Sequence, residues 1–150
     1  MNIRTTALDR LFSQYVRLRD GFKCRYSGQT EGIMDCAHVY SRRHVHTRWH
    51  PENAVCLSRR WHMYFTDHPH EWADWTRQHL GYDTVERMAI LSQRTDKLTD
   101  AARVEIGERL MESIRMMGEK PVCGLGRRLS AKKKAQSKYK RKVSGEVVLR

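Results

Sequence analysis

Two histidines and an asparagine between residues 35 and 62 are the side chains best suited to chemistry. An imidazole titrates near neutral pH, so His38 is predicted to act as a general base that takes a proton from water. His62 is predicted to bind a divalent cation, which would stabilise a scissile phosphate. Asn53 either ligates that metal through its amide oxygen or pins the loop that presents the base, and Asp35 is a candidate further ligand. Together they predict metal-assisted hydrolysis of a phosphodiester.

A β-hairpin followed by a short helix is predicted to position these side chains. The β-prone residues 37–40 suit a strand, a turn is expected at residues 50–53, and residues 54–57 can return as a second strand. From Ser58 onward the apolar residues follow helical spacing, and Pro69 limits the continuation of that helix. A strand, a loop and a helix would thus each contribute one functional side chain.

Further helices are predicted on both sides of this hairpin. Apolar positions repeat at i, i+3, i+4 and i+7 near the start of the chain, and turn residues separate the later helical segments. Asp83 and Thr99 are predicted to cap the last two helices. These late helices either support the site or form the face of a homodimer. In chain order, the expected spans are residues 8–20, 69–80, 84–93 and 100–117.

The segment resembles the HNH endonucleases of the ββα-metal fold, most closely the phage-encoded branch that includes the NinG-type recombination nucleases. The resemblance covers about residues 8–95. It includes a helix and knuckle at residues 11–28, the base-bearing strand DCAHVYSRR, the loop TRWHPENAV, and two helices at residues 59–81. It implies an α+β fold, in which a small ββα-metal core at residues 24–68 is flanked by α-helices.

The resemblance also assigns roles to individual positions. His38 stands at the family's general base, Asn53 at its central asparagine, and His62 at its final metal ligand, nine residues after the asparagine. The position before the base, often Asp or His in the family, is Ala37 here. Coordination would then rely on Asp35, Asn53, His62 and water. The expected metal is Mg²⁺ or Mn²⁺, with Zn²⁺ as an alternative.

A second departure concerns the zinc knuckle that many relatives build from two Cys-x-x-Cys pairs. The corresponding positions in this chain are Cys24, Ser27, Ser58 and Trp61. A four-cysteine structural zinc is therefore not expected, because three of the four thiolates are missing. Trp61 and neighbouring apolar groups are expected to fill that space. A shifted site built from Cys24, Cys36, Cys56 and a histidine is the alternative.

Length and composition indicate one domain with an appendage. The chain has 150 residues, which we divide into a domain at residues 1–117 and a tail at residues 118–150. It contains no run of 18 apolar residues and no hydrophobic signal segment at its start, which favours a cytoplasmic protein, in the host cell if the chain is phage-encoded. Four cysteines without a secreted framework fit reduced thiols.

Positive charge is concentrated at the C-terminal end. The formal net charge is +12, and residues 118–150 contain 11 Lys or Arg against two Glu. This tail is predicted to be disordered and to bind DNA phosphates as a basic arm, although a merely solvated tail is the alternative. A membrane role is not expected, because no amphipathic helix or lipidation motif accompanies the charge. The predicted DNA-binding residues of the arm are Lys132, Lys133, Lys134, Lys138, Lys140, Arg141 and Lys142.

Arginines also flank the predicted catalytic elements. They are Arg42, Arg43, Arg59 and Arg60. A guanidinium fork can bind two phosphate oxygens at once, so these residues are predicted to contact the DNA beside the scissile bond. The alternative for each is a solvated surface side chain.

These observations lead us to expect a metal-dependent HNH endonuclease that cleaves DNA. A homing-type enzyme, an enzyme acting on branched recombination intermediates and a nuclease that assists genome packaging all remain open. The alternative from another class is a non-catalytic DNA-binding module on a decayed HNH scaffold, which Ala37 and the missing cysteines would favour. RNA is a lesser alternative as the partner, because a basic arm does not distinguish the two phosphate backbones.

Overall fold

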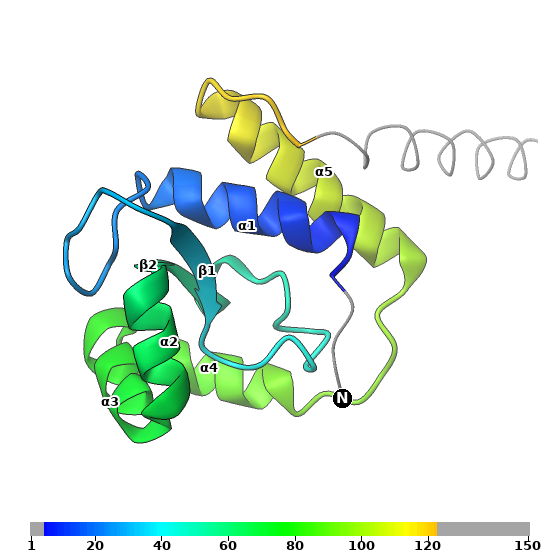
Figure 1. The fold of residues 1–150 in the computed structure, drawn as a ribbon. Coiled ribbons are helices and arrows are strands. Elements are labelled where there is room, and N and C mark those ends of the chain that lie inside the picture. Colours follow the sequence, from blue (N-terminus) through cyan, green and yellow to red (C-terminus); the bar gives the residue numbers. More distant parts are fainter. Residues whose placement is uncertain (1–4, 123–150) are drawn as a thin grey trace, which may run out of the picture.

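The computed structural model describes residues 5–122, which form a small α+β fold (Figure 1). Its sheet has two antiparallel strands, β1 (Met34–His38) and β2 (Ala54–Ser58). A long loop and a 3₁₀ turn, η1 (Pro51–Asn53), join the strands. The α-helices of this part of the chain are α1 (Ala7–Arg19), α2 (Arg59–Asp67), α3 (Pro69–Leu80), α4 (Tyr82–Ser92) and α5 (Asp100–Met116).

The hairpin has a fixed register in which Cys36 pairs with Cys56 and His38 with Ala54. The second strand agrees with the prediction, but the first begins and ends earlier than residues 37–40. Asn53 explains the early end of β1. Its carbonyl accepts a hydrogen bond from the Val39 amide at 2.8 Å, and its side chain accepts one from the next amide along the chain. The backbone therefore leaves the sheet directly after His38.

The helices begin and end close to the predicted positions, with one correction. The Thr99 side chain accepts a hydrogen bond from the Ala102 amide and caps α5, as predicted. Asp83 does not cap α4, because that helix already begins at Tyr82. Gly81 adopts a φ of 86°, a conformation that favours glycine, and separates α3 from α4. The prediction of Asp83 as a cap was therefore wrong.

Two apolar clusters hold these elements together. Helix α1 packs against the sheet and α5 packs against α1, whereas α2 contacts both strands and α3 packs on α2 (Figure 1). The first cluster lies around α1 and contains Leu8, Leu11, Phe12, Val16, Trp49, Ala54, Leu110 and Ile114. The second lies below α2 and contains Cys24, Met34, Ala37, Val55, Cys56, Leu57 and Phe65. The hairpin thus contributes side chains to both clusters.

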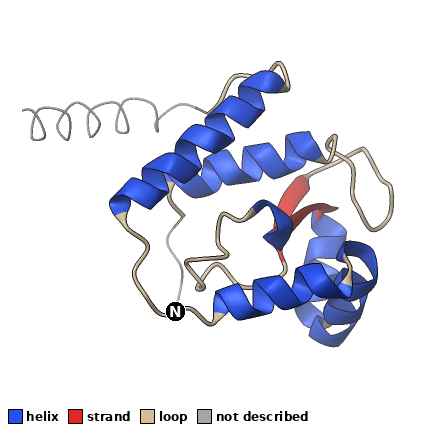
Figure 2. Cartoon of the chain, turned by 180° about the vertical axis from the view of Figure 1, so that it is seen from behind, coloured by secondary structure: helices blue, strands red, loops and turns tan. Residues whose placement is uncertain are grey.

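The long loop between the strands lies between α1 and α4 when the chain is viewed from behind (Figure 2). Its last turn, η1, contacts α4. The loop therefore packs against helices on two sides instead of extending into solvent. Within residues 5–122, no helix is long and apolar enough to cross a membrane. The predicted basic arm at residues 132–142 lies outside the described residues.

Candidate functional site

His38 is the last residue of β1, and its ring is anchored on both sides. The ring centroid lies 5.6 Å from that of Phe12 in α1. The Nε2 atom lies 3.0 Å from the carbonyl oxygen of Arg48. Because a carbonyl can only accept, Nε2 must carry the proton of this hydrogen bond. The neutral ring then has Nδ1 as its proton acceptor, which is the atom that a general base needs.

The surroundings of His38 keep its imidazole neutral. Burial is the largest cause and lowers the pKa of His38 to about 4, and the nearby Arg42 and His62 act in the same direction. The Arg48 carbonyl and the Asp9 carboxylate oppose this change and raise the pKa. His38 is therefore unprotonated at neutral pH and can accept a proton there.

Asn53 is fully buried beneath the loop and uses its whole side-chain amide there. The nitrogen donates to the carbonyls of Tyr40 and Thr47 at 3.0 and 2.9 Å. The oxygen accepts from the Tyr40 amide at 2.8 Å. Of the two roles that the sequence left open for Asn53, this geometry supports the pinning of the loop. The oxygen that would have ligated a metal is bonded to the loop backbone instead.

His62 lies in α2 and pairs with Asp35 of β1. Its Nδ1 atom is 3.3 Å from a carboxylate oxygen of Asp35, and its side chain is 40% exposed. A histidine that donates Nδ1–H to a carboxylate keeps Nε2 available as a metal ligand. Arg59 competes for the same carboxylate, with its Nε and Nη2 atoms 3.0 and 2.8 Å from the two oxygens. Arg59 first and His62 second lower the pKa of Asp35, so this carboxyl is ionised at neutral pH.

His38 and His62 line the same cavity, which has a volume of about 230 Å³. The two imidazoles reach it from the end of β1 and from α2, as the sequence predicted. Asp35 and Asn53 are not among the lining residues. Asp35 instead lies behind His62, and Asn53 holds the loop that covers His38. The other lining residues are Ala37, Val39, Ser41, Leu57, Phe65, Thr66 and Trp72.

Of the three predicted metal ligands, His62 is the one that lines this cavity. In residues 5–122, no group of three or more His, Cys, Asp or Glu side chains is arranged to hold a metal ion. His62, oriented by the Asp35 carboxylate behind it, offers a single nitrogen ligand. Mg²⁺ and Mn²⁺ commonly retain water and bind substrate phosphates and so need few protein ligands, whereas a lone imidazole nitrogen is a better ligand for Zn²⁺ than for Mg²⁺.

The four zinc-knuckle positions are brought close to one another around an aromatic cluster. The Trp61 ring packs on Tyr26 with centroids 4.3 Å apart, and Tyr26 also meets Phe65 edge-on at 5.0 Å. These contacts match the prediction that Trp61 and its neighbours fill this space. Cys24 is buried there, and the Oγ atom of Ser58 is buried without a hydrogen-bond partner in the described part of the chain.

The thiols of the alternative, shifted zinc site lie inside the fold. Cys36 and Cys56 face each other across the two strands. Burial raises the pKa of Cys36 to about 12 and that of Cys56 to about 11. Both thiols are therefore protonated at neutral pH, so zinc binding by Cys36 and Cys56 would require the release of two protons.

The four predicted DNA-binding arginines flank the cavity, but they differ in how they are engaged. Arg43 is exposed, and Arg42 is half-buried with Nη1 3.4 Å from the Thr5 hydroxyl. Arg60 is exposed and lies 5.7 Å from the centre of the Trp61 ring. Arg59 is the exception, because its guanidinium is already paired with a carboxylate. Within the described residues, Arg59 is thus the one of the four arginines whose guanidinium is paired with a carboxylate.

Sequence reasoning missed Asp9 and Arg48. The Asp9 carboxylate accepts hydrogen bonds from Nε and Nη2 of Arg48 at 2.8 and 2.6 Å and from Nε1 of Trp49 at 2.8 Å. Together with Thr6 it forms the capping box of α1. The spacing of Thr6 and Asp9 signals such a cap in the sequence. No local pattern connects Asp9 with the loop, which lies 39 residues further along the chain.

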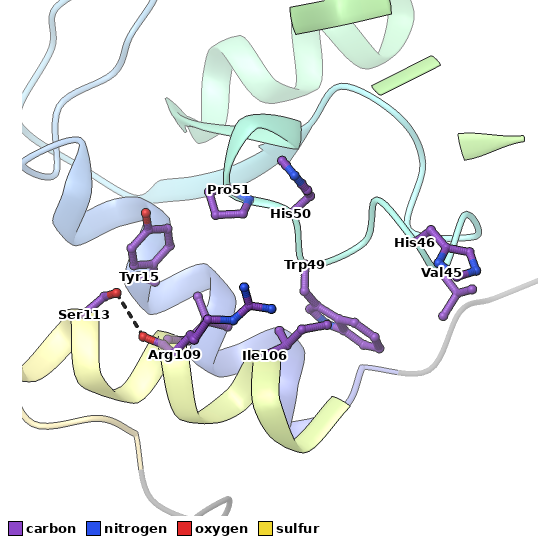
Figure 3. A pocket seen from close by; sticks show the side chains of 10 residues that line it. Tyr15, Val45, His46, Trp49, His50, Pro51, Ile106, Arg109 and Ser113 are labelled. Carbon is purple, nitrogen blue, oxygen red and sulfur yellow. Dashed lines mark hydrogen bonds between the residues drawn. The ribbon is translucent and has the colours of Figure 1, made fainter. Parts of the chain in front are cut away.

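A second cavity lies between the loop and α5 and has a volume of about 390 Å³ (Figure 3). Trp49 and His50 of the loop line it together with Arg109 of α5. Burial is the largest cause that lowers the pKa of His50. None of the residues predicted from the sequence to be functional lines this cavity.

Comparisons with protein-family models, curated proteins and solved structures find no match for this chain.

Proposed function

We propose that this protein is a metal-dependent endonuclease of the HNH type that hydrolyses phosphodiester bonds in DNA. The observation that carries the proposal is the shared cavity of His38 and His62, which pairs a neutral base with an imidazole that has a free ligand atom. The antiparallel hairpin followed directly by α2 is the arrangement expected of a ββα-metal core. The sequence resemblance to this family points to the same two residues.

His38 would act as the general base through Nδ1. A water molecule between this nitrogen and a bound phosphate would lose its proton to the ring as it attacks phosphorus. The ring would then be an imidazolium, whose Nε2–H already points at the Arg48 carbonyl. This hydrogen bond fixes the direction of the ring before the reaction and strengthens when the ring gains a charge. Positioning of the base is thus provided by the loop backbone.

His62 would hold the cation, and Asp35 would orient His62. A divalent metal bound there supplies positive charge that stabilises the scissile phosphate and the leaving oxygen. The ionised carboxylate of Asp35 lies close to the imidazole of His62, and its negative charge favours the binding of a cation there. Water and substrate oxygens would fill the remaining coordination positions, because Ala37 brings no ligand from the position beside the base.

DNA is the proposed substrate because arginines adjoin, in sequence, the elements that carry the two histidines and because the chain is strongly basic. Arg42 and Arg43 follow β1, and Arg60 lies in the first turn of α2, so each flanks a catalytic element. The chain as a whole has a net charge of +12, which favours binding to a polyanion. Binding of RNA, homing-type or branched-DNA specificity, and a homodimeric assembly are further alternatives within this proposal.

A second candidate is a DNA-binding module that no longer cleaves. It is favoured by the engagement of both Asp35 oxygens with Arg59 and by the apolar Ala37 next to the base. In this case the basic surface would remain functional, and His62 would be an exposed histidine in an ion-pair network. Binding without cleavage is therefore the outcome that separates the two candidates.

The experiment that tests the proposal compares cleavage of supercoiled plasmid and of a synthetic four-way junction in Mg²⁺, Mn²⁺ or EDTA. We expect metal-dependent cleavage that is lost in His38→Ala and retained in His70→Ala. His70 is a suitable control because it is exposed in α3 and does not line the cavity. Preference for one substrate would distinguish a plasmid-cutting enzyme from a recombination enzyme. DNA binding with no cleavage in any metal would refute the nuclease and leave the binding module.

A further inference from the structure

Asp9 is a buried carboxylate that joins α1 to the loop covering His38. Its side chain is almost completely buried, and the structure gives it five hydrogen bonds. Two come from Thr6 and serve the N-terminal cap of α1. Three come from Arg48 and Trp49 of the loop. A cap needs only the first pair, so the other three bonds require a separate explanation.

Two of the three loop bonds come from Arg48, the residue whose carbonyl binds the predicted base. The guanidinium of Arg48 binds Asp9, and the carbonyl of the same residue accepts the Nε2–H of His38 at 3.0 Å. The next residue, Trp49, is also fixed to Asp9 and is 6% exposed. Both Arg48 and Trp49 are therefore held by one carboxylate, directly beside the carbonyl that orients the imidazole.

The second anchor of the loop is Asn53, which binds the backbone of Tyr40 and of Thr47, the residue just before Arg48. The Arg48 amide also donates to the His44 carbonyl at 3.0 Å. These contacts hold the loop backbone, whereas Asp9 binds the side chains of Arg48 and Trp49 and ties this end of the loop to α1. Helix α1 also supplies Phe12, whose ring lies beside the imidazole.

We propose that Asp9 is a positioning residue for the general base, acting through Arg48. This proposal rests on the proposed nuclease function, because it assigns to Asp9 a role in the same reaction. Asp9 does not line the cavity with His38 and His62, so it does not contact substrate. Its carboxylate helps to fix the residue whose carbonyl binds Nε2 of His38, which leaves Nδ1 as the proton acceptor of the ring. A fixed ring direction matters because a displacement of about 1 Å can reduce a rate by about 100-fold.

Asp9→Asn tests the proposal most directly. The amide keeps the size of the side chain but replaces one acceptor oxygen with a donor, which conflicts with Arg48 Nε and Trp49 Nε1 at the Oδ1 position or with Arg48 Nη2 and Thr6 at the Oδ2 position. We expect kcat for DNA cleavage to fall by about 10- to 100-fold, while KM changes by less than about twofold, because the basic surface is unaltered. Thr99→Ala is the matched control, since it removes the N-cap of α5 without touching the loop.

Trp49→Phe is a milder variant in case Asp9→Asn does not fold. It removes one hydrogen bond to Asp9 and keeps an aromatic ring in the core. We expect kcat to fall by about threefold, again with KM unchanged. Both variants are assayed below the unfolding transition, measured by circular dichroism on the same samples. A fall in kcat no larger than that of Thr99→Ala would overturn the proposal.

A spectroscopic measurement separates this inference from the proposed function. The Nε2–H proton of His38 should give a hydrogen-bonded imidazole resonance in the NMR spectrum of the wild type and of Thr99→Ala. We expect Asp9→Asn to lose this resonance through exchange with water. An unchanged resonance in Asp9→Asn would overturn the positioning role, whatever the activity. Loss of the resonance in a protein whose wild type does not cleave DNA would refute the nuclease and support the positioning of His38 by Asp9.

Discussion

The two histidines that share the cavity are held in contrasting ways. His38 is enclosed by α1 and by the loop, and its ring is fixed by a backbone carbonyl and an aromatic neighbour. The side chain of His62 is 40% exposed, and the single polar partner of its ring among the described residues is Asp35, which Arg59 also binds. The fold therefore fixes the His38 side of the candidate site, whereas the His62 side is partly exposed to solvent.

This difference indicates which groups the fold itself must place. The ring of a general base must be held in a fixed orientation. The buried hydrogen bonds of Asp9 and Asn53 determine the path of the loop whose carbonyl orients the His38 ring. A cation can adjust its water and phosphate ligands, so its protein ligand needs less support. We therefore expect variants on the His38 side to affect folding strongly, and variants on the His62 side to affect mainly metal binding.

The largest effect on stability is expected from Asn53→Ala. The change leaves the amide of Tyr40 and the carbonyls of Tyr40 and Thr47 without their buried partner. At about 1–3 kcal/mol for each unsatisfied buried group, the free energy of unfolding should fall by about 3–5 kcal/mol. Urea denaturation measures this value, and Gln78→Ala, an exposed amide in α3, is the control. A fall below about 1 kcal/mol would contradict the pinning role.

The next effect concerns stability in acid. The pKa of His38 in the folded protein is about 4, below its ordinary value of 6.5, so the unfolded chain binds the proton more readily. The stability conferred by the neutral ring is complete above pH 6.5 and is lost as the pH falls toward 4. The expected loss is about 2–3 kcal/mol.

His38→Gln should remove this part of the pH dependence. Urea denaturation at intervals between pH 7 and pH 4.5 measures it, a range in which the lowered pKa values keep Asp9 and Asp35 ionised. The wild type should lose stability across this range, and the variant should lose markedly less. Parallel curves for the two proteins would show that His38 is not held in the neutral form.

A smaller effect is expected on the His62 side. Arg59→Met keeps the aliphatic stem but removes the guanidinium that binds both oxygens of Asp35 at 2.8 and 3.0 Å, one of which also contacts His62. The affinity for Mn²⁺ should rise by about threefold, because the cation no longer competes with a guanidinium. Calorimetric titration with MnCl₂ measures the change. Arg60→Met is the control, and equal affinity in both variants would show that Asp35 does not influence the metal.

The smallest effect is expected from Ser58→Ala, just before the helix that carries His62. The Ser58 Oγ atom is buried, has no partner among the described residues and makes no cap bond to α2. Removing it should raise the free energy of unfolding by up to about 1 kcal/mol. Ser92→Ala is the matched control, since that hydroxyl donates to the Ala89 carbonyl at 2.6 Å and its loss should be destabilising. Destabilisation by Ser58→Ala would indicate a partner for its hydroxyl.

The sequence predicted the elements of the site because their signals are local. The apolar spacing after Ser58, the limit at Pro69 and the cap at Thr99 all correspond to the structure. The spacing of the two histidines predicted that His38 and His62 come together, and both line one cavity. These signals depend on near neighbours in the chain, which is why a single sequence can carry them.

The remaining features depend on tertiary contacts that no local pattern encodes. The early end of β1 comes from the Asn53 side chain binding the backbone of Tyr40. Arg59 was predicted to contact DNA, but the hairpin brings Asp35 within reach of its guanidinium. Asp9 completes the capping box of α1 and also anchors the loop. In each case a polar side chain found a partner that lies 13 to 39 residues away.

The central claim is that His38 is the base of a metal-dependent nuclease. It is tested most directly by single-turnover cleavage of DNA in Mn²⁺ by the wild type and by His38→Ala, with and without added imidazole. We expect the variant to be slower by about 10²- to 10⁴-fold, with part of the rate restored by imidazole. Equal rates for the two proteins would contradict the claim, as would DNA binding by the wild type without cleavage.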